Sequence, residues 1–171
     1  MNPLAVALTA AGAALLAAGK AAGAATRAVP FDAIFTRMAK KYGTPKRLMV
    51  AIVSYESGFN PRAENEEAKA DAKRGRDVDS LGLGQILWPD TAGDYGIKDR
   101  ERLFDPETNL DAVARIVRDK LKRYPALPGE FPADAVSAYN AGTSLRKQGG
   151  SFGNQEYVNR VRSKWEEYAD V

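Results

Sequence analysis

The stretch "TPKRLMVAIVSYESGFNP", residues 44–61, decides the fold. Leu48 and Ile52 fall on one face of a helix, and Val50 and Val53 fill the other side. Apolar side chains therefore surround most of the segment. The pattern predicts a helix that is buried on most of its circumference and forms the centre of a helical domain.

Both ends of this helix carry recognisable signals. Thr44 is expected to be the N-cap with Pro45 at the first helical position, and Gly58 is expected to end the helix. Glu56 then lies in the last turn, just before a glycine-proline turn. Such a carboxylate is either an ordinary surface Glu or a catalytic proton donor.

The rest of the domain shows helical periodicity and no convincing strand alternation. Residues 62–80 are read as a solvated loop or a short polar helix. Asp105 is expected to cap the longest of the remaining helices, with Pro106 at its first position. Helices are predicted at 31–42, from Pro89, at 105–124, at 132–142 and at 154–169. The predicted fold class is all-α.

Composition limits the chemistry. The 171 residues suit one domain, and a formal net charge of +3 fits an acidic polymer without identifying one. The sequence has no Lys/Arg cluster interleaved with aromatic residues, so nothing in it indicates a nucleic-acid partner. Cys and His are both absent, which excludes thiol nucleophiles, Ser-His-Asp triads and His or Cys zinc sites. An enzyme of this composition is expected to work through carboxylates, alone or with a bound hard metal.

Residues 1–29 form a separate Ala/Gly-rich apolar segment, and the domain is expected to span 30–171. Three interpretations stay open for this segment: a signal-like peptide, an envelope anchor in contact with a membrane, or an Ala-rich helix within an assembly. A flexible end is the remaining alternative.

Glu56 has features that suit a general acid. Such a group must stay protonated near neutral pH, although the ordinary pKa of Glu is about 4.3. The helix macrodipole disfavours an anion in the last turn, and the preceding apolar residues favour the neutral form.

Five motifs in this order resemble the soluble Slt-type lytic transglycosylases of the goose-type lysozyme superfamily: "AIVSYESGFNP", "LGLGQI" with "PDTA", "FDPETNL", "VSAYNAG" and "YVNRV". The resemblance covers about residues 31–168. It implies a lysozyme-like helical fold and cleavage of the β-1,4 bond between N-acetylmuramic acid and N-acetylglucosamine in peptidoglycan. It also implies that Glu56 is the catalytic acid and that no metal or cofactor is required.

The same resemblance assigns substrate-binding roles to Ser57, Gln85, Tyr139, Asn140 and Tyr157. Ser57 would hold the sugar or cap the helix, and Gln85 would contact substrate in the cleft. Tyr139 and Asn140 would line the cleft, with Tyr139 able to hydrogen-bond Glu56. Tyr157 is either near the site or only part of the core.

Two features depart from the family pattern. Gly84 stands where the family usually has Met, and the expectation is that it opens space or adds flexibility near the substrate. Gly82 and Gly84 would let the backbone approach the glycan or simply form a turn. The segment between Glu56 and Gln85 is about ten residues longer than usual, with the excess in the charged stretch 64–79.

The implied mechanism needs one carboxylate, because the substrate's N-acetyl group attacks the anomeric carbon and a 1,6-anhydro ring forms. One alternative is a goose-type lysozyme acting by hydrolysis, with Asp79, Asp90 or Asp94 positioning a water. A second is a non-catalytic glycan-binding or structural component of an assembly.

The expected setting is the periplasm or cell envelope, or a phage virion that delivers the protein there. Virion or secretion-complex proteins would bind through residues 1–29. Among these settings the Ala-rich start favours the phage particle.

Overall fold

A computed structural model describes residues 28–66 and 79–171. The Ala-rich segment expected at 1–29 lies outside this part of the chain except for its last two residues. The elements run in the order α1 (Asp32–Tyr42), α2 (Lys46–Ser57), β1 (Glu64–Glu66), β2 (Asp79–Leu81), β3 (Ile86–Trp88), α4 (Asp90–Asp94), the 3-10 helix η2 (Arg100–Phe104), α5 (Pro106–Arg123), α6 (Ala133–Ala141) and α7 (Gln155–Glu167). The chain is mainly helical, as predicted.

Helix α2 is the centre of the core. Every residue from Leu48 to Val53 is buried, which confirms the prediction from the sequence. The helix packs against α1, α5 and α7. Glu56, at its C-terminal end, is therefore carried by the most thoroughly packed element of the fold.

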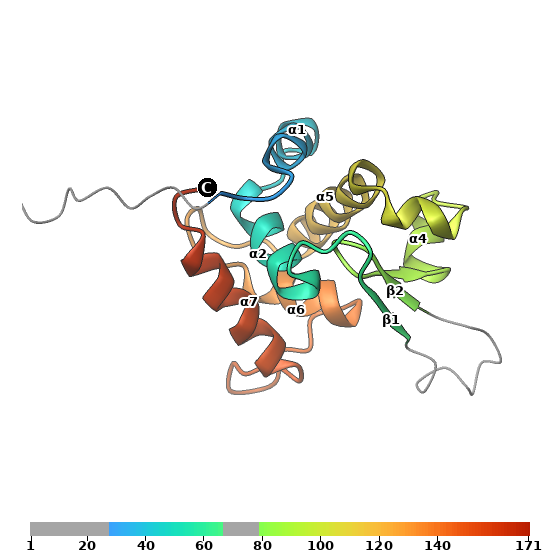
Figure 1. Cartoon of the computed structure of the whole chain (residues 1–171). Helices are drawn as coiled ribbons and strands as arrows, with labels where there is room; N and C mark the ends of the chain where they lie inside the picture. The colour runs from blue at the N-terminus through green and yellow to red at the C-terminus, as the bar shows by residue number, and fades with distance from the viewer. Residues whose placement is uncertain (1–27, 67–78) are drawn as a thin grey trace, which may run out of the picture.

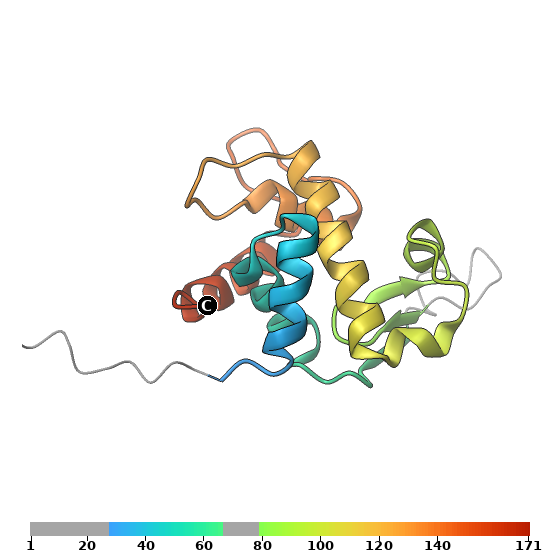
Figure 2. The same ribbon diagram turned by 90° about the horizontal axis from the view of Figure 1, so that it is seen from above.

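The small sheet and α4 form a lobe on one side of α5, while α7 lies on the other side (Figures 1 and 2). Helix α5 separates the two parts and packs against α1 and α6. The functional residues expected from the sequence come from both sides of this division.

The expectation of no strands is wrong. Three short antiparallel strands pair in the order β1-β2-β3. The guanidinium of Arg100 binds Glu64 on β1 and Asp79 on β2, the latter at 3.0 Å. Strands of three residues are too short to show alternation, and an ion pair from a distant element helps to hold them together.

Thr44 does not cap α2. The N-cap is Pro45, and the Thr44 hydroxyl donates to the backbone carbonyl of Ala114 in α5 at 3.0 Å. Thr44 is buried, so a tertiary partner replaces the local one that the sequence suggested.

The remaining helices agree with their predicted positions to within a few residues. Within residues 28–66 and 79–171, no helix combines the length and apolar character that crossing a membrane requires.

Asp105 caps α5 as predicted. Its carboxylate accepts bonds from the Thr108 hydroxyl at 2.7 Å and the Thr108 backbone N–H at 2.8 Å, and these bonds lower the pKa of Asp105. A lowered folded-state pKa stabilises the protein above the ordinary carboxyl pKa, and that stability is lost as the pH falls through the folded value. Asp105→Ala should therefore cost about 1 kcal/mol at pH 7 and progressively less below about pH 4.

Asp105→Asn is the matched control for this cap. An Asn side chain caps as well as Asp but does not titrate in this range. Urea unfolding from pH 3 to pH 7 should show near-native stability for Asp105→Asn at pH 7 without the acid-dependent component. An Asp105→Ala penalty that is the same at pH 3 and pH 7 would contradict this account.

Candidate active site

Glu56 lies in the last turn of α2 and is half-buried. Gly58 ends the helix in the left-handed conformation, with φ of 58°, which a side chain would disfavour. The hydroxyl of Tyr157, on α7, donates to Oε1 of Glu56 at 2.6 Å. The carboxylate is thus held between two helices that pack against each other in the core.

Tyr157 is suited to remain a hydrogen-bond donor. Burial and then the negative charge of Glu56 raise the pKa of Tyr157 well above its ordinary value, so the phenol keeps its proton at neutral pH. The ring of Tyr55 packs against this ring in a T-shaped arrangement, with the centroids 5.2 Å apart. Tyr157, for which a core role was equally open, makes the bond to Glu56.

The structure corrects the expectation that Tyr139 hydrogen-bonds to Glu56. The Tyr139 hydroxyl instead donates a hydrogen bond to the backbone carbonyl of Gly84 at 2.9 Å. Burial, followed by the charge of Glu56, raises the pKa of Tyr139 well above its ordinary value. The charge of Glu56 therefore acts on Tyr139, although the hydrogen bond of Tyr139 goes to the turn that joins β2 and β3.

That turn, residues 82–85, is bonded by side chains from three helices. Ser57 of α2 donates to the carbonyl of Leu83 at 2.8 Å. Tyr139 of α6 binds Gly84 O, and Asn109 of α5 accepts the Gly84 N–H at 2.8 Å. Ser57, next to the predicted acid, links α2 directly to the turn that carries Gln85.

Asn109 is the residue that the sequence analysis missed. It is completely buried, and its amide donates to the carbonyls of Leu81 at 3.1 Å and Leu103 at 2.8 Å. These two bonds use both side-chain N–H groups, and the bond from Gly84 uses the oxygen, so both polar atoms of the buried side chain are hydrogen-bonded. The signal was available: Asn109 stands one turn before Val113 on the otherwise apolar inner face of α5.

The glycines of the turn do not open space. A Cβ at Gly82 would lie 2.1 Å from the carbonyl oxygen of Leu103. A Cβ at Gly84 would lie 2.2 Å from Cγ2 of Val113 and 2.8 Å from the Tyr139 hydroxyl. The expectation that Gly84 leaves room near the substrate is therefore wrong, because Val113 and Tyr139 already fill that room.

Gln85 ties the turn to β1. Its φ is 49°, and its Nε2 donates to Gly82 O at 2.9 Å and Ala63 O at 3.2 Å. Its Oε1 accepts a bond from Asn65 at 2.6 Å. Both side-chain N–H groups of Gln85 are therefore used within the protein, and no residue of 28–66 or 79–171 occupies the second lone pair of its Oε1.

Asn140 lies in the last turn of α6 and is exposed. Its Oδ1 accepts a bond from Nδ2 of Asn154 at 3.0 Å. The structure thus joins Glu56, Ser57, Gln85, Tyr139 and Tyr157 through the end of α2, the turn and α7. Asn140 belongs to a neighbouring network.

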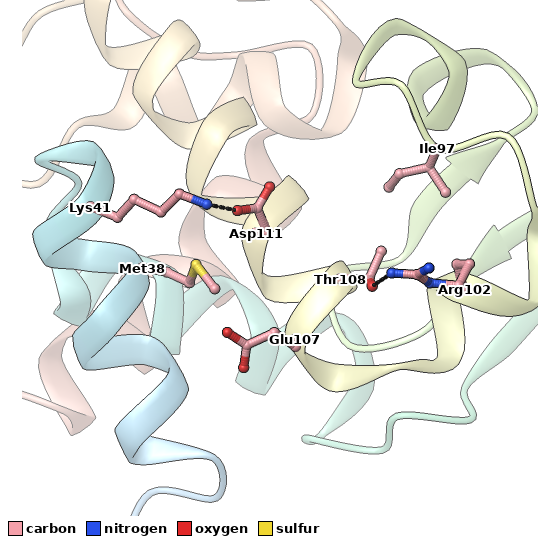
Figure 3. A pocket seen from close by; sticks show the side chains of 7 residues that line it. All are labelled: Met38, Lys41, Ile97, Arg102, Glu107, Thr108 and Asp111. Carbon is pink, nitrogen blue, oxygen red and sulfur yellow. Dashed lines mark hydrogen bonds and ion pairs between the residues drawn. The ribbon is translucent and has the colours of Figure 1, made fainter.

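A separate hollow of about 270 Å³ lies between α1, η2 and α5 and contains none of the predicted site residues (Figure 3). Its polar groups bind one another: Lys41 binds Asp111 at 2.8 Å, and Arg102 binds the Thr108 hydroxyl at 3.1 Å. Across residues 28–66 and 79–171, no group of three or more acidic side chains is placed to hold a metal ion.

Comparison with solved structures identifies the fold first. The lytic transglycosylase Slt from Pseudomonas aeruginosa, solved as an inactive mutant with Gln in place of Glu, matches with a TM-score of 0.59 at 19% sequence identity. The match covers 82% of this chain and 24% of that one. The two proteins share a fold.

The family follows from the sequence comparison. The model of the transglycosylase SLT domain matches residues 33–161, and the chain belongs to this family. The membrane-bound lytic murein transglycosylase C of Actinobacillus pleuropneumoniae is 27% identical over 146 residues, which are 79% of this chain and 37% of that protein. The protein of the same name from Salmonella arizonae is 32% identical over 92 residues, covering 50% of this chain and 22% of the relative.

The close contact at Gly84 predicts a steric penalty. Gly84→Ala should lower the free energy of unfolding by about 1–3 kcal/mol, because the new methyl group overlaps Val113 and Tyr139. The double variant Gly84→Ala/Val113→Ala should lose less free energy of unfolding than the sum of the two single losses, because the smaller side chain at 113 relieves the overlap. Thermal and urea unfolding measure both effects.

Gly93→Ala is the matched control, since a Cβ there meets nothing within 4 Å and Gly93 lies inside α4. It should be neutral or slightly stabilising. Equal stability of Gly84→Ala and Gly93→Ala would show that the turn is not packed as described.

Proposed function

We propose that this protein is a peptidoglycan lytic transglycosylase with Glu56 as its catalytic acid and base. It would cleave the β-1,4 bond between N-acetylmuramic acid and N-acetylglucosamine and release 1,6-anhydromuramoyl products. The bond from Tyr157 to Glu56 is the observation that carries the proposal, because it holds one carboxylate at the end of a buried helix in a member of the SLT family. The chain spans little more than a third of the length of the Actinobacillus relative.

The reaction needs one carboxyl group and no water. Glu56 first donates its proton to the leaving glycosidic oxygen while the substrate's N-acetyl carbonyl oxygen attacks the anomeric carbon. The ionised Glu56 then takes the proton of the C6 hydroxyl, whose oxygen displaces the acetamido group and closes the anhydro ring. Glu56 ends the cycle protonated, ready for another substrate.

The neighbouring residues serve this cycle in different ways. Tyr157 stabilises and orients the ionised Glu56 between the two proton transfers, since a phenol with a raised pKa remains a donor. Ser57 and Tyr139 hold the turn against α2 and α6. Gln85 and Asn140 supply polar contacts to the sugar.

Hydrolysis requires a second group that positions a water, and the structure disfavours Asp79 for this role. Its carboxylate is held by Arg100 at 3.0 Å in an ion-pair cluster that also contains Glu64. Asp90 and Asp94 lie on α4 beyond β3. A non-catalytic structural component would not need a carboxylate that is held by a buried tyrosine hydroxyl, as Glu56 is by Tyr157.

The relatives are named as membrane-bound murein enzymes, which supports a place of action in the cell envelope. Local wall penetration by a phage particle or an envelope-spanning machine fits a small wall-cutting domain. Residues 1–29 would supply the contact with a membrane, a virion or a secretion complex.

Mass spectrometry of muropeptides tests the proposed reaction. Purified sacculi incubated with the full chain should yield anhydromuropeptides, and Glu56→Gln should yield none, because Gln cannot transfer the proton. Glu107→Gln, which alters a carboxylate paired with Arg37 on another face, should keep full activity. Reducing-end products that vanish in Glu56→Gln would establish a hydrolase instead, and no products from the native chain would remove the enzymatic proposal.

Tyr157→Phe tests the bond to Glu56. Its hydroxyl favours the ionised carboxylate, so its loss should let Glu56 keep its proton to higher pH. The alkaline limb of the pH–rate profile should move to higher pH, with kcat about tenfold lower at the optimum.

Tyr55→Phe is the control for this change, because the ring of Tyr55 packs against the same ring in a T-shaped arrangement. Its profile should overlay that of the native enzyme. An unshifted alkaline limb in Tyr157→Phe would show that the bond does not govern proton transfer.

A further inference from the structure

We infer that Asn154 is a positioning residue that fixes Asn140 as a hydrogen-bond donor toward the ligand, so that Asn140 recognises a carbonyl oxygen. The inference rests on the proposed function for the identity of the ligand. The orientation of the two side chains stands on the structure alone.

The orientation of Asn154 follows from its buried neighbour Ser137. The Ser137 hydroxyl donates to Oδ1 of Asn154 at 2.7 Å, and Nδ2 of Asn154 donates to the backbone carbonyl of Ser137 at 3.1 Å. A backbone carbonyl only accepts, so the amide nitrogen of Asn154 has to face it. The Ser137 oxygen also accepts the backbone N–H of Leu145 at 3.1 Å, which leaves its proton for Asn154.

The orientation of Asn140 follows from that of Asn154. Nδ2 of Asn154 lies 3.0 Å from the Asn140 side chain, and a donor there requires the oxygen of Asn140. The amide nitrogen of Asn140 then points away from Asn154. Its two N–H groups make no bond to residues 28–66 or 79–171, and the side chain is exposed.

Gln85 and Asn140, the two side-chain amides proposed to contact the sugar, therefore differ in the groups they present. Gln85 donates both side-chain N–H groups to the carbonyls of Gly82 and Ala63, so toward a ligand its side chain can only accept a hydrogen bond. Asn140 turns its oxygen toward Asn154, which occupies one lone pair, and presents its two N–H donors on the other side. The N-acetyl group of an amino sugar contains both complements, an N–H and a carbonyl, and the carbonyl oxygen is the group that Asn140 would bind.

Binding of penta-N-acetylchitopentaose to the full chain carrying Glu56→Gln, measured by calorimetry, tests the polarity. Adding Asn140→Asp keeps the oxygen that faces Asn154 and replaces the outward nitrogen by oxygen. This change should weaken binding at least about tenfold, and by more than Asn140→Ala does. Asn154→Ala should weaken binding by less than Asn140→Asp, because Asn140 can still adopt the donor orientation.

Asn159→Asp is the control for added charge. Asn159 lies on α7, is exposed, and accepts a bond from Gln155 at 2.8 Å that an Asp can also accept. Its affinity should equal that of the Glu56→Gln parent. Binding of Asn140→Asp as tight as that of the parent, or tighter than that of Asn140→Ala, would overturn the inference.

Side-chain amide exchange, measured by NMR on the free protein, tests the orientation without a ligand. The Asn154 amide protons should exchange at least about tenfold more slowly than those of Asn140, because two bonds protect them. Protected Asn140 protons beside exposed Asn154 protons would overturn the inference, whether or not the oligosaccharide binds. Failure of the Glu56→Gln parent to bind, with the predicted exchange pattern, would count against the glycan and leave the orientation standing.

Discussion

The site depends on how the turn at residues 82–85 is held. Helices α2, α5 and α6 each contribute one side chain that bonds its backbone: Ser57, Asn109 and Tyr139. The close approach of α5 and α6 allows only hydrogen at Gly84. A turn fixed from three directions gives Gln85 a defined position relative to the end of α2, where Glu56 lies. Preorganisation of this kind is what a site with a single acid requires.

The carboxylate of Glu56 is bonded from the opposite side of the fold. Helix α7 brings the Tyr157 hydroxyl to Glu56, across 101 residues of sequence. One face of the site is thus built from the turn and the other from α7, and the buried helix α2 connects them. Under the proposed function, both faces would hold Glu56 in place while it gives up and regains its proton. This arrangement suits a reaction in which the same carboxyl group acts twice and the remaining chemistry belongs to the substrate.

Local signals allowed much of this to be predicted. The periodicity of α2, the Asp105 cap and the position of Glu56 at a helix end all depend on neighbours in sequence, and the structure confirms them. The strands, the Thr44 hydroxyl and the partner of Glu56 depend on distant elements that local patterns do not reveal. Gly84 shows the same limit: a glycine that suggests open space in the sequence proves to be filled by Val113 from α5.

The central claim is that one carboxylate performs cleavage without water. The most direct test is to digest sacculi with the full chain in water labelled with heavy oxygen and to examine the muramic ends of the products by mass spectrometry. The account predicts anhydro ends with no label, since the C6 oxygen of the sugar closes the ring. Incorporation of one labelled oxygen at these ends would contradict it, because only hydrolysis places a solvent oxygen there.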